Sequence, residues 1–346
     1  MRTLKLLAAS IVVLALLAVP RIGHAQGLMV SGYADFEAFV INPDGSGNSD
    51  FYFDNHHFNL ILSGALMTNL IAAAEIEYEH AGEEIAVEYA YIGYTGFKNV
   101  RIMAGKFIVP FGRFNKDLHP TWINKMIDRP HGFKDVFPQT YSDVGLWVTG
   151  AVPMPNGNRF AYDFFVVNGL MGPDGGGIRG MRDNDREKRT GARDDNKAIG
   201  GRLGFELGPA GLDFGTSVYF GNYSDDEATG KLNLVLFGAD VAYRNSGFEL
   251  RGEVISASQD ATAGDLTKTG GYLQAAYLVT PKFEPVVRYS ARNMPTDAQD
   301  NSRFSIGVNF YVSSSAAVRI NYHFNGEKSG LESDNNVLAT QFTIGF

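Results

Sequence analysis

The amino-acid sequence predicts an all-β protein: a transmembrane, antiparallel, up-and-down β-barrel of about sixteen strands that follows a cleavable signal peptide. Three features predict this class. They are an apolar leader, a series of segments with a period of two residues, and connections that alternate between long and short. At roughly twenty residues per strand and connection, fourteen or eighteen strands would also fit the length of the chain.

The start of the chain has the properties of an export signal. Two basic residues precede an apolar run at 6–19, and small residues at 23 and 25 suit cleavage after Ala25. The alternative, a membrane anchor, is disfavoured because a spanning helix needs about 20 apolar residues. We therefore expect a signal peptide at 1–25 and an outer-membrane barrel domain at 26–346.

Composition excludes several classes of function. The chain has no cysteine, so neither disulfides nor thiolate chemistry are expected. Its formal charge is −8, and removing the three basic residues of the leader gives −11. A chain this acidic is a poor general binder of nucleic acid.

Strict alternation of apolar and polar side chains recurs along the mature chain. The segment "GFELRGEVIS" places Phe248, Leu250 and Val254 on one face and charged residues on the other. Facing is ambiguous in the segments near 85 and 100. In all, sixteen such segments begin near residues 30, 58, 72, 85, 100, 144, 160, 199, 212, 237, 248, 272, 283, 304, 316 and 335.

The connections distinguish a membrane barrel from a soluble sandwich or propeller. They alternate in length, and only the connection near 80–84 is short on the long side. A sheet can span a bilayer only when it closes on itself, with apolar side chains facing lipid and polar ones facing water. The long connections lie near 41–53, 110–140, 170–197, 222–232, 258–269, 292–302 and 325–335.

The last segment ends on an aromatic residue. Phe342, Ile344 and Phe346 share one face of the final strand. This ending resembles the C-terminal signal that barrel-insertion machinery recognises. We therefore expect an outer-membrane location in a Gram-negative-type bacterium, with contacts to lipid and lipopolysaccharide.

Several segments resemble the phosphate-selective porin O/P family. They are "YAYIGYTGFKNVRIMAGKFIVPFGRFN" (89–115), "YSDVGLWVTGAV" (141–152), "GGYLQAAYLVTPKFEPVVRYS" (270–290), "FGADVAY" and "IGVNFY". The resemblance spans most of the mature chain. It implies a sixteen-stranded, homotrimeric outer-membrane porin for passive diffusion of small hydrophilic solutes, with a mild anion, phosphate-like preference.

The alternation also predicts which charges face the lumen. Rings of arginine or lysine favour anions and rings of acids favour cations. The charges either solvate a water-filled wall or form a sorted field that orients solutes. The expected basic set is Arg202, Arg251, Arg288 and Arg319, and the expected acidic set is Asp35, Glu37, Glu75, Glu77, Glu79, Asp240 and Glu253.

The long connection at 110–140 is the candidate constriction. It carries five basic and three acidic residues, a charge of +2 in an acidic chain. It either folds into the lumen and narrows it or stays outside against solvent and lipopolysaccharide. Its basic residues are Arg113, Lys116, Lys125, Arg129 and Lys134.

No enzyme, cofactor or metal site is expected. The histidines are scattered along the sequence, and none is paired as in a barrel hydrolase. Three other functions remain open: a general porin, a cation-preferring porin, and a closed structural or adhesin-type barrel.

Overall fold

The computed structural model describes residues 26–42, 50–118, 120–138, 140–181, 197–224, 230–296, 299–328 and 335–346. The expected signal peptide at 1–25 and parts of the long connections lie outside these ranges. No helix among the described residues is long and apolar enough to cross a membrane.

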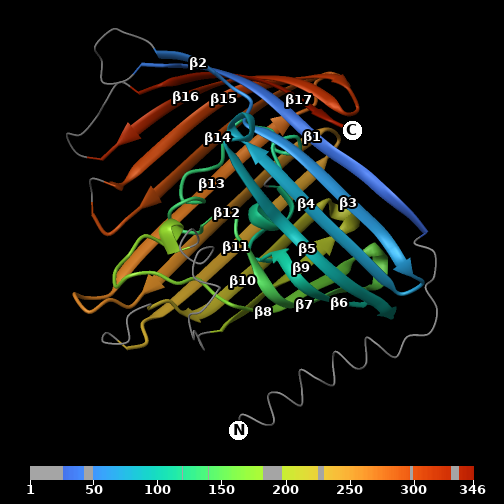
Figure 1. Ribbon diagram of the computed structural model, residues 1–346. Helices are drawn as coiled ribbons and strands as arrows, with labels where there is room; N and C mark the ends of the chain where they lie inside the picture. The colour runs from blue at the N-terminus through green and yellow to red at the C-terminus, as the bar shows by residue number, and fades with distance from the viewer. Residues whose placement is uncertain are drawn as a thin grey trace, which may run out of the picture.

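The chain is built almost entirely of long strands (Figure 1). The strands are β1 (Gln26–Ile41), β2 (Asp50–Asp54), β3 (His57–Met67), β4 (Leu70–Glu79), β5 (Glu84–Phe97), β6 (Val100–Ile108), β7 (Ser142–Pro153), β8 (Arg159–Val167), β9 (Ala198–Leu207), β10 (Leu212–Asn222), β11 (Asn233–Asn245), β12 (Phe248–Gln259), β13 (Leu266–Tyr277), β14 (Phe283–Asn293), β15 (Asn301–Ser313), β16 (Ala316–Glu327) and β17 (Val337–Gly345).

The strands form one closed antiparallel sheet. From β3 to β17 each strand pairs with its neighbours in sequence, and β1 closes the ring by pairing with both β3 and β17. Short β2 pairs with the end of β1, where it continues the line of β3 across a break at Asn55 and His56. Seventeen labelled strands therefore make sixteen spanning strands, as the sequence predicts.

The short and long connections lie at opposite ends of the barrel, again as predicted. On β12, Phe248 and Val254 point outward and Glu249, Arg251 and Glu253 point inward and are buried. On β5 the alternation shifts, because the register with β4 slips between the Glu75 and Ile76 pairs. That irregularity is a β-bulge, and it explains why facing in the segment near 85 is ambiguous from sequence.

The connection between β6 and β7 folds into the barrel (Figure 1). Its apolar side chains pack against the inner faces of β8 to β13 in a dry core. A wholly polar lumen, which alternation alone would suggest, is therefore wrong for this part of the barrel. The core includes Phe111, Phe114, Phe133, Val136 and Phe137 of the connection, and Phe165, Tyr219, Leu234, Ile255 and Tyr272 of the wall.

Candidate pore and its inserted loop

The inserted loop, defined here as residues 109–141, is closed at its base by the backbone. The Val109 N–H donates to the Tyr141 carbonyl at 2.9 Å. The Asn115 side chain bridges the same two residues, donating to the Val109 carbonyl at 2.8 Å and accepting from the Tyr141 N–H at 3.0 Å. The loop therefore enters and leaves the barrel wall at one point.

The entry turn of the loop is fixed to the wall by Glu253 of β12. Its carboxylate accepts a hydrogen bond from the Phe114 N–H at 2.9 Å, and the Gly112 N–H donates to Ser217 of β10 at 2.9 Å. Gly112 has φ +64°, and a Cβ there would collide with the Glu253 carboxylate. Glycine tolerates both the positive φ and the close carboxylate, because it has no Cβ. Glu253, which the sequence predicts to line the pore, therefore contacts the loop.

The strongest anchor of the loop is Asp128. Its carboxylate forms ion pairs with Arg288 of β14 and Arg303 of β15, and its carbonyl accepts from Arg288 Nη1 at 3.0 Å. Burial alone would raise the pKa of Asp128, but the charges of Arg288, His323 and Arg303 outweigh it and lower the pKa. Arg288, expected to face the lumen, therefore holds the loop.

Arg319 of β16 also binds the loop. Its guanidinium donates to the carbonyls of Thr121 at 2.7 Å and Trp122 at 2.9 Å. The Thr121 hydroxyl also donates to the Asp35 carboxylate at 2.5 Å, on β1, which is separated from β16 in the sheet only by β17. This part of the loop is therefore held at the neighbouring strands β16 and β1.

The basic residues of the loop separate in space. Lys125 pairs with Glu284 of β14 at 2.5 Å, and Lys116 pairs with Asp163 of β8 at 2.5 Å. Arg113 pairs with Asp213 of β10. The charge of Arg129 acts on His56 near the acidic wall, and Lys134 is exposed.

The other expected basic wall residues are also paired. Arg202 of β9 makes a two-point ion pair with Asp240 of β11, with nitrogen–oxygen distances of 2.9 and 2.5 Å. Arg251 pairs with Glu249 on its own strand. Asp240 therefore pairs with Arg202 and does not belong to the group of acidic residues on β1 and β4.

Between the loop and the strands β6 to β9 lies a cavity of about 850 Å³. Five basic and two acidic side chains line it: Arg101, Arg113, Lys116, Arg159, Arg202, Asp117 and Glu206. The acids that pair with Arg113, Lys116 and Arg202 are not part of the lining. The lining of this cavity is therefore more basic than the protein as a whole.

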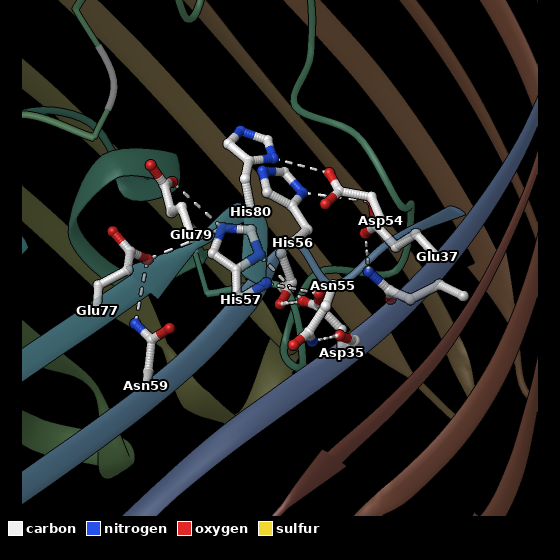
Figure 2. A network of polar contacts seen from close by, with 12 residues as sticks. Asp35, Glu37, Asp54, Asn55, His56, His57, Asn59, Glu77, Glu79 and His80 are labelled. Atoms are coloured by element: carbon white, nitrogen blue, oxygen red, sulfur yellow. Dashed lines mark hydrogen bonds and ion pairs between the residues drawn. The ribbon is translucent and has the colours of Figure 1, made fainter. Parts of the chain in front are cut away.

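The acidic residues of β1 and β4 form a second, separate wall. Asp35, Glu37, Glu75 and Glu77 are buried, and Asn59 of β3 donates to Glu75 at 2.7 Å and to Glu77 at 3.1 Å. At the end nearest the long connections, three histidines lie among these carboxylates (Figure 2). The acidic wall, defined as Asp35, Glu37, Glu75, Glu77 and Glu79, is thus a continuous surface.

The histidine cluster was not predicted from the sequence. The histidines were expected to be scattered, whereas His56, His57 and His80 lie together in the structure. His56 and His57 lie at the start of β3, and His80 follows β4. The turn of this hairpin lies at Thr68 and Asn69, and a register shift between Ala65 and Met67 places His57 opposite Glu79. Counting outward from the turn would have brought His57 close to residues 79 and 80, but the register shift decides which of the two it faces. Asp128 and Arg303 gave no such signal, because their partners are far apart in sequence.

The C-terminal residues close the seam of the barrel. Phe342, Ile344 and Phe346 are exposed on the outside. Phe346 exchanges two backbone hydrogen bonds of 2.9 Å with Gly32 of β1, and its ring stacks on Phe58 at 6.2 Å. A Cβ at residue 32 would collide with the Phe346 ring and the Asn59 carbonyl, so the terminal aromatic fits against a glycine.

Solved structures of porins share this fold. The anion-selective porin of Comamonas acidovorans is 14% identical, with a TM-score of 0.67 over 92% of this chain and 99% of that one. OmpF of Salmonella typhi in complex with daunomycin is 12% identical, with a TM-score of 0.62 over 92% and 97%. The trimer form of OmpT from Vibrio cholerae is 11% identical, with a TM-score of 0.59 over 93% and 100%.

Sequence comparison identifies the family. An uncharacterised protein of Aquifex aeolicus (strain VF5) is 26% identical over 289 residues, which are 75% of this chain and 63% of that protein. The chain thus spans less than two thirds of that relative's length. The model of the Gram-negative porin family matches residues 9–330. The chain therefore belongs to the Gram-negative porin family and is an outer-membrane β-barrel porin.

Proposed function

We propose that small hydrophilic solutes cross this porin between the inserted loop and the wall of β6 to β9, with a mild preference for anions such as phosphate. The observation that carries the proposal is the cavity of about 850 Å³ with five basic and two acidic lining residues. Basic side chains at a narrow, wet passage attract anions, and they act within a screening length of about 8 Å.

The preference is mild because most of the basic side chains have acidic partners. Arg202 pairs with Asp240, Lys116 with Asp163, and Arg159 with Glu206. Each pair cancels much of its field at a distance. Two likenesses support an anion preference: the resemblance of 89–115 to phosphate-selective porins, and the shared fold with a porin described as anion-selective.

The inserted loop is proposed as the constriction. It is tied to β1, β8, β10, β14, β15 and β16 through side chains and carbonyls. A segment fixed at so many points is rigid enough to set the width of the passage. The dry core on its other side leaves the polar side as the route for solutes.

The reversal potential in a potassium chloride gradient tests the preference. The purified protein in a planar bilayer should select chloride over potassium, and the double variant Arg101→Gln/Lys116→Gln should shift toward potassium. Lys282→Gln, in the short β13–β14 connection away from the cavity, is the matched control. A cation-selective wild type whose selectivity does not change in the double variant would disprove the proposal.

A cation-preferring pore is the second candidate. The acidic wall of β1 and β4 favours it, since its carboxylates are continuous and face the interior. The same gradient experiment separates the two, because an acid-dominated pore would select potassium. Well-folded protein without channel steps would instead favour a closed, structural barrel.

A homotrimer is proposed, with the outside of β3 to β6 as its interface. Small outward residues there, including Ala72, Ala74, Ala90 and Ala104, leave a shallow groove of about 510 Å³ rimmed by Leu62 and Ile92. Small side chains let neighbouring subunits approach closely. Ala74→Trp should convert trimers to monomers on native electrophoresis. Leu203→Trp, on the outside of β9, is the control, and trimers in both variants would move the interface elsewhere.

We further propose that residues 1–25 direct export and that Phe342, Ile344 and Phe346 are read by the insertion machinery. Phe346→Asp keeps the backbone pairing with Gly32, and a charge near the membrane interface costs only about 0–1 kcal/mol. A large loss from the outer membrane would therefore reflect recognition. Normal outer-membrane levels of this variant, measured by fractionation, would rule out the signal.

A further inference from the structure

Three histidines gather inside the barrel at the end of the long connections (Figure 2). Centroids of the His56 and His57 rings are 3.8 Å apart, and the His56 and His80 rings stack at 5.1 Å. The backbone holds them there: the His80 N–H donates to the His56 carbonyl at 3.1 Å, and the Ala81 N–H donates to the Asn55 carbonyl at 2.9 Å. The cluster is therefore part of the fold of the β3–β4 hairpin.

Asp35 fixes the orientation of His57. Its carboxylate lies 3.0 Å from His57 Nδ1 and also accepts the His57 backbone N–H at 2.9 Å. Nδ1 donates its proton to this carboxylate, so in the neutral imidazole Nε2 carries the lone pair. Carboxylates that hold one ring nitrogen in this way are the usual partners of metal-binding histidines.

The free nitrogen of His57 faces more carboxylates. Nε2 lies 3.6 Å from Glu79 Oε1 and 3.8 Å from Glu77 Oε1. These distances are too long for good hydrogen bonds. They suit two ligands of one ion, because ligands about 2.0–2.1 Å from a tetrahedral ion lie roughly 3.3 Å apart. Without an ion between them, the lone pair on His57 Nε2 and the carboxylates of Glu77 and Glu79 would repel one another.

Ligand atoms of His56, His57 and Glu79 all lie within 4.8 Å of one another. A second set, Glu37, Asp54 and His56, meets the same condition and shares His56. His56 Nδ1 lies 3.3 Å from Glu37, and His80 Nδ1 lies 2.9 Å from Asp54. His57 is buried while His56 and Glu79 are partly exposed, so an ion could reach the site from water.

The charge around the cluster also calls for a cation. Asp35, Glu37 and Glu77 are buried, and the hydrogen bonds that they accept from Thr121, Gln341 and Asn59 do not neutralise their charge, which is costly to bury. Arg129 contributes a positive charge that acts on His56. With Asp54 and Glu79 included, however, five carboxylates lie within 4 Å of a ring nitrogen of the three histidines.

We propose that His56, His57 and Glu79 bind one divalent transition-metal ion of the zinc class, with Asp35 as the residue that positions His57. Imidazole with carboxylate suits zinc, copper and nickel, whereas calcium and magnesium take oxygen ligands. A bound ion would neutralise part of the acidic wall at the outer mouth. This site is independent of the proposed anion preference, and it departs from the sequence-based expectation of no metal.

The test measures metal binding by purified, folded, untagged protein in detergent. The protein is stripped with a chelator, titrated with zinc chloride by calorimetry, desalted and analysed for retained metal. Wild type should retain one zinc ion per chain. His57→Gln and Glu79→Gln should weaken binding by at least about 100-fold, and Asp35→Asn, which removes the charge of the orienting carboxylate, by about 10–100-fold.

His323→Gln is the matched control, because this buried histidine of β16 contacts Ser305 and lies outside the cluster. Cobalt substitution supplies a readout that needs no variant, since a tetrahedral nitrogen and oxygen site gives visible absorption bands. Wild-type protein that retains neither ion would overturn the proposal even if a variant fails to fold. Binding lost equally in His323→Gln, or retained in both His57→Gln and Glu79→Gln, would do the same.

Discussion

The two charged walls of this barrel differ in what their charges contact. Arginines of β14, β15 and β16 point inward and end on the inserted loop, at Asp128 and at the carbonyls of Thr121 and Trp122. Carboxylates of β1 and β4 point inward and end mainly on histidines and amides of neighbouring strands. Thr121 is the contact between the loop and the acidic wall.

This difference shows that an inward charge does not by itself line a pore. Arg288 and Arg319 occupy the same kind of position in the strand pattern as Glu75 and Glu77. Their role is set by the loop that comes to lie against them. The arginines of β14 to β16 are therefore structural where they meet the loop, and the basic side chains that line the cavity lie on β6, β8, β9 and the entry of the loop.

Deleting residues 116–134 should have the largest effect. It removes the contacts of the loop with both walls, so single-channel conductance should rise several-fold. Circular dichroism in detergent checks that the barrel is intact. Unchanged conductance in a folded variant would mean that the loop does not limit the passage, and the contrast between the two walls would lose its functional meaning.

Asp128→Ala should have the next largest effect, on stability. It leaves Arg288, whose side chain is fully buried, and Arg303 without their partner. Breaking a buried pair costs about 3–5 kcal/mol, and the partial exposure of Asp128 favours the lower end. Thermal unfolding should shift down and conductance should become noisier as the loop loosens. Asp265→Ala, at an exposed site, should do neither.

The double variant Glu75→Gln/Glu77→Gln should have a smaller effect, on selectivity alone. Glutamine keeps an oxygen for the Asn59 amide, so the fold should persist. Removing two charges should raise the chloride-to-potassium permeability ratio by about fivefold or less, since a screened charge contributes about 1 kcal/mol. A shift toward potassium, measured from the reversal potential, would contradict the assignment of this wall as the cation-attracting one.

His131 should give the smallest effect, visible only as a pH dependence. Burial, reinforced by the charge of Arg303, lowers the pKa of His131 in the loop to about 3. The unfolded value is about 6.5, so the released loop binds a proton more readily. The inserted position should therefore lose stability as pH falls from about 6.5 to about 3. His131→Gln should remove this part of the pH dependence of conductance, and an identical profile in both proteins would refute it.

Local patterns in the sequence predicted the framework of the barrel. Alternation in segments such as 248–254 depends only on neighbouring residues, because a strand exposes successive side chains on opposite faces. The lengths of the connections assign the ends of the strands, and both predictions agree with the structure. The slip on β5 was the exception, because a bulge depends on the partner strand.

The candidate sites divide in the same way. The approach of His57 to residues 79 and 80 was within reach of the sequence, since a tight turn brings the two strands of a hairpin together. The exact pairing of His57 with Glu79 depends on a register shift between Ala65 and Met67. The pairing of Asp128 with Arg288 and Arg303 spans 160 and 175 positions along the chain, and no local rule connects them. Basic residues of one loop also moved to different walls, which their order in sequence does not indicate.

The sequence by itself therefore determined a closed outer-membrane barrel of about sixteen strands and, outside the segments near 85 and 100, which side chains face inward. Those properties follow from the two-residue period and from the need to pair every backbone group in a bilayer. Only the tertiary structure decided what the inward side chains touch. A loop of 109–141 can lie inside or outside the same barrel, and its position depends on apolar packing and ion pairs with residues far away in sequence.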